Sequence, residues 1–120
     1  EEATPDTVDA ILEEASKFAS EILDPINHSG DEEGSVWNDG AVTTPKGFKQ
    51  AYKQYVEGGW GALPFDHEWG GQGLPKLVAT AVEEMRTSSN MAFSLCPLLP
   101  QGAIHALERL ELETIDQPRT

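Results

Sequence analysis

The sequence predicts an all-α fold, a small up-and-down bundle of four to five helices, and three observations support this. Several segments place apolar residues at steps of three and four, which is typical of a helix with one face against a core. No segment shows the strict alternation of a half-buried strand. Hydrophobic residues make up 38% of the chain, enough for a folded core. Its 120 residues correspond to one domain, spanning 1–120.

The first helix is predicted to begin at Thr4 and Pro5, because threonine caps a helix and proline suits its first position. Pro25 is expected to end it, since the residue before a proline is pushed out of the helical region. Residues 27–44 are rich in Gly, Asp and Glu and predict a long surface connection, with Trp37 anchoring it to the core. The apolar stripe of this helix consists of Val8, Ile11, Leu12, Ala15, Phe18, Ala19, Ile22 and Leu23.

A second helix is predicted to follow Thr44 and Pro45, which repeat the capping pattern of the first. Gly58 and Gly59 should end it, because glycine adopts the left-handed conformation without steric cost. Its apolar face contains Phe48, Ala51, Tyr52, Tyr55 and Val56.

A glycine-dense turn at residues 68–75 precedes a third helix that begins near Pro75. Ser89 or Asn90 is expected to cap the next helix. Residues 91–99 are almost uniformly apolar and are therefore expected to be buried on every side, with Pro97 and Pro100 breaking the helix. The polar tail 111–120 is expected to be frayed or artificial.

The charge of the chain excludes several functions. It carries 21 acidic and 8 basic residues, a formal net charge of −13. Nucleic-acid binding needs clustered Lys and Arg, which are absent, and anionic membranes are disfavoured for the same reason. No apolar run is long enough to span a bilayer. A single cysteine and the lack of a signal peptide lead us to expect a cytoplasmic protein.

Candidate binding motifs fail on spacing. Gly70-Gly71-Gln72-Gly73 matches no phosphate-loop template, and a tight turn between helices is the favoured interpretation. Asp66-His67-Glu68 could offer metal ligands, but adjacent residues in a loop diverge, so a solvated turn is favoured. A helical metalloenzyme would require a ligand cluster that the sequence lacks.

Candidate catalytic groups have little support either. Glu83 and Glu84 are expected to form ion pairs with Arg86 or Lys76 rather than to act as acid and base. The apolar neighbours of Cys96 predict a buried, inert thiol. Ser94 lacks a nucleophile elbow, and His105 is expected on the helix surface or in the core. We therefore assign no catalytic, cofactor-binding or metal-binding residue. Residues 91–99 could line a hydrophobic pocket, although plain core is the favoured interpretation.

The order of these segments resembles the N-terminal helical domain of acyl-CoA dehydrogenases. The resemblance is carried by residues 58–60 (Gly-Gly-Trp), 68–75 (Glu-Trp-Gly-Gly-Gln-Gly-Leu-Pro) and 89–93 (Ser-Asn-Met-Ala-Phe). Residues 18–27 are similar to the first helix of that domain and its exit. The string 33–52 is closest to the bacterial branch that includes 3-methylmercaptopropionyl-CoA dehydrogenases.

The resemblance implies a three-part enzyme with a middle β-barrel domain and a C-terminal helical bundle. Such enzymes bind FAD and oxidise the Cα–Cβ bond of an acyl-CoA to a trans-2-enoyl-CoA, with a glutamate as the base. The resemblance places the base and most FAD contacts outside this chain, so no FAD is expected on these 120 residues alone. The implied partners are an acyl-CoA, an electron-transfer acceptor and further copies in a homo-oligomer. The sequence departs from the family pattern after Leu110, for which truncation or divergence are the two explanations.

The resemblance also suggests a contribution to the substrate pocket. The corresponding helix of the family helps to wall the far end of the acyl cavity. The substrate-binding residues carried over are Phe93, Ser94, Leu95, Leu98 and Gly102. The alternative function is a free-standing, non-enzymatic interaction module with an apolar groove closed by a partner helix or a lipid tail.

Overall fold

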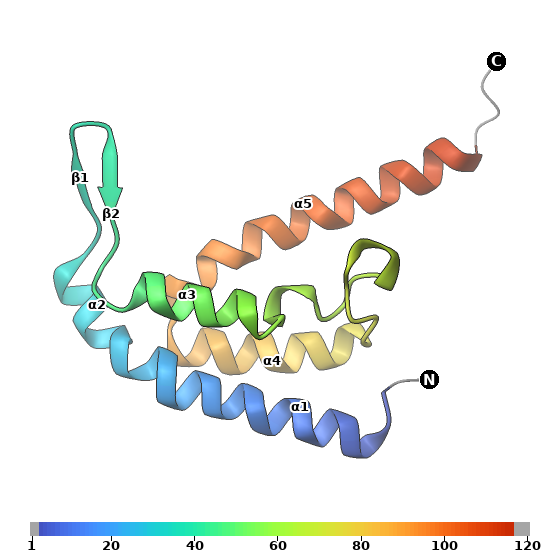
Figure 1. The fold of residues 1–120 in the computed structure, drawn as a ribbon, viewed down its shortest axis with the longest axis horizontal. Coiled ribbons are helices and arrows are strands. Elements are labelled where there is room, and N and C mark those ends of the chain that lie inside the picture. The colour runs from blue at the N-terminus through green and yellow to red at the C-terminus, as the bar shows by residue number, and fades with distance from the viewer. Residues whose placement is uncertain (1–2, 117–120) are drawn as a thin grey trace.

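The computed structural model describes residues 3–116 and contains an up-and-down set of helices with one small hairpin (Figure 1). Successive long helices alternate in direction, as predicted for a bundle. Their bounds are α1 Pro5–Lys17, α2 Asn27–Glu33, α3 Phe48–Glu57, α4 Lys76–Ser89 and α5 Met91–Asp116. The radius of gyration is 17.0 Å, above the roughly 14 Å of a compact domain of this length. The helical prediction is therefore confirmed, but the arrangement is open.

The first helix begins where the sequence predicts and continues further than expected. The Thr4 side chain accepts a hydrogen bond from the backbone N–H of Thr7, and Pro5 occupies the first turn. Pro25 does not end the helical path, contrary to the prediction. A π-helical segment Phe18–Leu23 and a 3₁₀ turn Asp24–Ile26 lead directly into α2. Pro25 lies in the first turn of the 3₁₀ segment. A backbone N–H at that position has no partner within the segment, so proline costs no hydrogen bond there.

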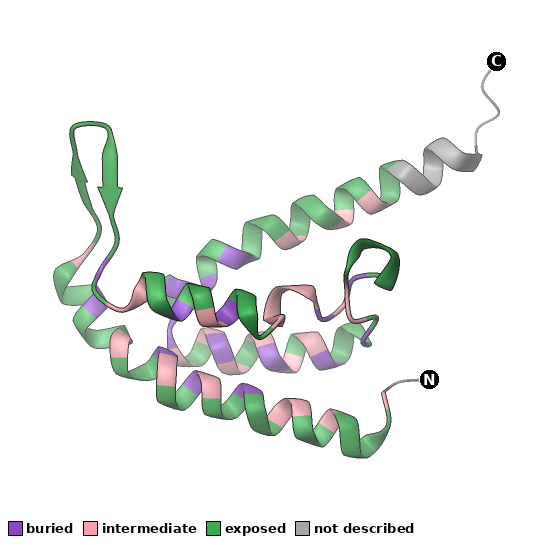
Figure 2. Ribbon diagram, in the orientation of Figure 1, coloured by how far each residue is buried: buried purple, intermediate pink, exposed green. Residues whose placement is uncertain are grey.

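The predicted long loop contains ordered structure, so that interpretation was wrong. After α2, strands β1 Val36–Asn38 and β2 Ala41–Thr43 form an antiparallel hairpin, with Trp37 opposite Val42. Asp39 and Gly40 both have positive φ angles, as the tight turn of a short hairpin requires. Trp37 does not anchor the loop, because 70% of its surface is exposed. The hairpin projects from the helices with all its residues exposed (Figure 2).

The second predicted helix begins later than expected. Thr44 does not cap it; α3 starts at Phe48, with Gly47 as its N-cap at a positive φ. A hydrogen bond from the Lys46 backbone N–H to the Glu33 carboxylate holds this turn against the end of α2. The predicted end at Gly58-Gly59 is confirmed, since Gly59 adopts the left-handed conformation.

The glycine-dense segment is a tight turn between helices, as predicted. One short 3₁₀ turn, Trp60–Ala62, precedes it, and a second, His67–Trp69, overlaps its start. The chain then doubles back, and the backbone N–H groups of Gln72, Gly73 and Leu74 donate to the carbonyls of residues 62, 65 and 63 respectively, each at 2.9 Å. A side chain at Gly71 would overlap the Phe65 carbonyl. This close backbone approach explains the glycine at position 71.

The core has two clusters joined by Trp60. The first cluster lies between α1 and α4 and contains the buried residues Ala15, Leu63, Leu74 and Val82. The second lies where the π-helical segment, α3 and α5 meet, and contains Leu23, Ala51, Tyr55 and Phe93. Trp60 packs against both clusters.

The fifth helix differs most from the prediction. Pro97 and Pro100 lie inside α5 and do not interrupt it. The apolar run at its start is not buried on every side either: Leu95, Leu98 and Leu99 are 57%, 45% and 78% exposed. Only one face of this stretch, with Phe93 and Ser94, is buried. Helical backbone continues through residue 116 of the predicted frayed tail, and residues 117–120 lie outside the described part.

Candidate functional site

Buried polar groups join α4 to its neighbours, and no local pattern predicts them. Arg86 is only 4% exposed. Its guanidinium donates to the Tyr55 hydroxyl at 2.9 Å and to the Ser94 hydroxyl at 3.2 Å. It also contacts the Glu83 carboxylate at 3.4 Å, which is one of the ion pairs considered from the sequence. One arginine thus links α3, α4 and α5.

The pKa of the Tyr55 hydroxyl responds to this setting. Burial raises the pKa of the Tyr55 hydroxyl, while the nearby Arg86 charge and hydrogen bonds from Arg86 and Gln101 partly oppose the rise. The guanidinium carbon of Arg86 also lies 5.4 Å from the centre of the Tyr55 ring, a cation–π distance. The hydroxyl therefore stays protonated at neutral pH and serves as a structural partner of Arg86.

Asn90 caps the fifth helix, as predicted, and does more than that. Its side-chain oxygen accepts from the Phe93 backbone N–H at 3.0 Å. Its side-chain nitrogen donates to the Leu23 carbonyl at 3.2 Å. A 3₁₀ turn begins just after Leu23. The backbone N–H of Asn27 therefore donates to the Asp24 carbonyl and not to the Leu23 carbonyl. Asn90, 1% exposed, thus satisfies a buried carbonyl at the bend near Pro25.

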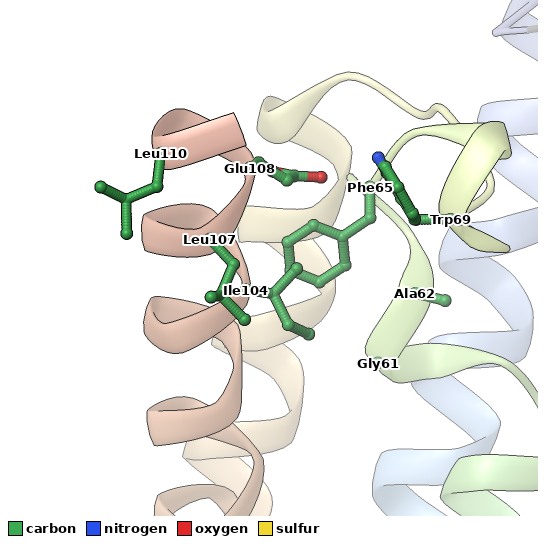
Figure 3. A pocket seen from close by; sticks show the side chains of 9 residues that line it. Gly61, Ala62, Phe65, Trp69, Ile104, Leu107, Glu108 and Leu110 are labelled. Atoms are coloured by element: carbon green, nitrogen blue, oxygen red, sulfur yellow. The ribbon is translucent and has the colours of Figure 1, made fainter. Parts of the chain in front are cut away.

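Two hollows lie along α5. A distal groove of about 660 Å³ separates α5 from the glycine-dense turn (Figure 3). The Phe65 ring lies between Ile104 of α5 and Trp69 of the turn, whereas Leu110 points away. A proximal groove of about 670 Å³ lies between the hairpin, α3 and the start of α5. It is lined mainly by apolar side chains, including Val42, Phe48, Tyr52, Phe93 and Cys96.

The five residues assigned to substrate contact separate into two groups. Phe93 is buried and reaches the proximal groove, and the Ser94 hydroxyl is held by Arg86. Leu95, Leu98 and Gly102 are spaced by three and four residues, so they share the outer, exposed face of α5. The five therefore lie on two different faces of α5.

Other sequence candidates have structural roles. Cys96 is exposed at the proximal groove, so the prediction of a buried thiol was wrong. Asp66 caps its 3₁₀ turn by accepting from the Glu68 backbone N–H. His105 packs its ring 5.0 Å from Phe65 and approaches the Glu108 carboxylate at 3.4 Å. Among the side chains described, those of residues 3–110, no three His, Cys, Asp or Glu gather in a way that could hold a metal ion.

The glycine-dense turn has no free backbone donors for a phosphate. The N–H groups of Gly70, Gly71, Gln72 and Gly73 all donate to carbonyls of residues 62–67. A diphosphate needs such groups pointing outward. The turn therefore does not fit the diphosphate of a dinucleotide cofactor. None of the described helices is long and apolar enough to cross a membrane.

Comparison with known proteins shows the family. Over 102 residues the chain is 46% identical to 3-methylmercaptopropionyl-CoA dehydrogenase of Ruegeria pomeroyi, an alignment covering 85% of this chain and 17% of that protein. The chain belongs to the acyl-CoA dehydrogenase family. It is also 30% identical over 106 residues to butyryl-CoA dehydrogenase of Syntrophomonas wolfei, covering 86% of this chain and 17% of that enzyme. No protein-family model matches the chain.

The alignments cover most of this chain but only a small part of each relative. The chain spans 17% of the length of each of these two relatives, although most of its own residues align with them. The first of these dehydrogenases belongs to the branch that the string 33–52 resembles.

Proposed function

We propose that this chain forms the N-terminal helical domain of an FAD-dependent acyl-CoA dehydrogenase, an enzyme that oxidises the Cα–Cβ bond of an acyl-CoA to a trans-2-enoyl-CoA. The observation that carries the proposal is the 46% identity to a named acyl-CoA dehydrogenase over 85% of the chain. The resemblance implies a middle β-barrel domain and a C-terminal helical bundle as the other parts. An electron-transfer acceptor and a homo-oligomeric state belong to the same proposal.

The open apolar surface supports the role of a domain that packs against other domains. Leu95, Leu99 and Leu107 are more than half exposed on one helix. Contiguous exposed apolar surface of this kind usually marks an interaction site. A free-standing module would be expected to expose less, so this surface argues against that alternative.

The chain's own contribution to catalysis, in this proposal, is a wall for the acyl tail. Leu95, Leu98 and Gly102 form an open apolar strip that an aliphatic chain can contact without losing any hydrogen bond. Phe93 and Ser94 lie behind the strip and fix its position through the core and Arg86. The resemblance assigns the glutamate base and most flavin contacts to the other parts, and the bonded backbone donors of the glycine-dense turn agree with this assignment.

Two experiments test the proposal. The reading frame should continue beyond Thr120 into a β-domain, and a frame that stops there contradicts it. In the complete gene product, Gly102→Leu should fill the tail strip and lower kcat/KM for the longest acyl-CoA accepted by roughly tenfold. A short acyl-CoA should be oxidised as before. Ala106→Leu, one turn further along α5, is the matched control; equal losses for both variants or for both chain lengths would contradict the assignment.

A further inference from the structure

The fifth helix has a weak point between an anchored part and an open part. Pro97 and Pro100 both lie within its helical backbone. Proline has no backbone N–H, so the helix lacks the bonds to the carbonyls four residues earlier, those of Phe93 and Cys96. Sharp bends in helices concentrate at proline. Bending is therefore easiest at residues 97–100.

The part of α5 before the prolines is fixed from several sides. Asn90 caps it and bonds to Leu23, and the Ser94 hydroxyl accepts from Arg86. The Phe93 ring lies in the core, with its centre 5.9 Å from that of Tyr55. These contacts come from three separate elements, so this part moves with the bundle.

The part of α5 after the prolines is held much less firmly. Gln101 reaches the Tyr55 hydroxyl, and the His105 ring lies 5.0 Å from Phe65. Beyond these contacts the helix diverges from α3 and α4 (Figure 1). Leu107 and Leu110 are 65% and 59% exposed. The distal groove lies along this weakly held part.

We propose that α5 is a hinged arm that bends at Pro97–Pro100 and opens or closes the distal groove. Closing moves Ile104 and Leu107 towards Phe65 and Trp69 (Figure 3). It removes apolar surface from water on both sides of the groove, which favours the closed form. Opening breaks contacts such as those made by Gln101 and His105. The arm carries Gly102 and Leu107, which the proposed function also uses, but the experiments below measure movement and so test the hinge separately from that function.

Distances between paired spin labels, measured by pulsed electron paramagnetic resonance, test the hinge. Glu84→Cys on α4 supplies a fixed exposed site. Its partner is the native, exposed Cys96 for the anchored part, or Ala106→Cys in a Cys96→Ser background for the arm. The distance distribution to position 106 should be about twofold wider than that to Cys96, because the arm samples open and closed forms.

Replacing the prolines distinguishes a hinge from general fraying. Pro97→Ala/Pro100→Ala restores both backbone donors and should narrow the distribution to position 106 to the width seen at Cys96. Pro97 is buried, so the double variant could fail to fold. Pro100→Ala, at an exposed site, is therefore the second variant. It should narrow the distance distribution to position 106 partly. The distance distribution between labels placed at position 84 on α4 and position 16 on α1 should remain unchanged in every variant. A width that persists in Pro100→Ala, or a wild-type arm as narrow as the anchored part, overturns the proposal.

Discussion

The start of α5 and its later stretch 103–110 both carry apolar residues at helical spacing but have different surroundings. Near its start, Phe93 and Ser94 are buried, and Asn90 and Arg86 tie the backbone and a side chain to the bundle. Further along, Leu107 and Leu110 are mostly exposed (Figure 2). The difference shows that the contacts available on neighbouring elements decide burial, and that an apolar sequence alone does not. Substitutions that treat the two ends alike should therefore have unequal effects.

The largest difference is expected between the inner and outer faces of α5. Phe93→Ala should lower the free energy of unfolding by about 3–4 kcal/mol, because it leaves a cavity in the second core cluster. Leu99→Ala, on the 78% exposed side chain, should change it by less than about 0.5 kcal/mol. Urea denaturation followed by helical circular dichroism measures both. Equal losses would show that the outer face is covered in solution.

The next effect concerns the polar contacts at the start of α5. Asn90→Ala removes a helix cap and leaves the buried Leu23 carbonyl without its partner, which should cost about 2–3 kcal/mol. Ser88→Ala is a nearby control, since its hydroxyl is exposed and bonds only within α4. The same denaturation curves report both. A cost no greater than that of the control would mean that Asn90 does not anchor α5.

The smallest effect depends on pH. Tyr55→Phe removes the hydroxyl that Arg86 contacts and should cost about 1 kcal/mol at pH 7. Because the folded pKa of Tyr55 lies above its ordinary value of 10.0, folding favours the protonated hydroxyl. That contribution is complete below pH 10.0 and is lost as the pH rises through the folded pKa. Unfolding curves from pH 8 to 11 should therefore fall less steeply for Tyr55→Phe than for the wild type. Parallel slopes would contradict the buried hydroxyl.

Local signals predicted several helix starts and ends. Thr4 and Pro5 mark the start of α1, Gly59 ends α3, and Asn90 caps α5. Each of these depends on the conformation or hydrogen bonding of a few adjacent residues, so a short stretch of sequence contains the information. Family membership could also be inferred this way, since the glycine-dense turn and the strings around it carry the resemblance.

Errors arose where a distant partner decides the outcome or where an element is too short to show a periodic pattern. Pro25 fails to end the helical path because the chain changes to π and 3₁₀ turns, and Asn90 satisfies the carbonyl of Leu23 from 67 residues away. The hairpin was missed because its strands are three residues each, too short for a periodic pattern. The burial of Arg86 could not be foreseen either, since its partners Tyr55 and Ser94 lie on other helices.

The candidate site shows the same division. By itself the sequence determined the helical class, the tight glycine turn and the apolar character of residues 91–99. Only the tertiary structure decided which of those side chains are buried, placing Phe93 in the core and leaving Leu95 and Leu98 outside. A helix presents different residues on each side, and which side faces the core depends on the position of its neighbours. Those positions follow from long-range packing, which no local pattern in this chain specifies.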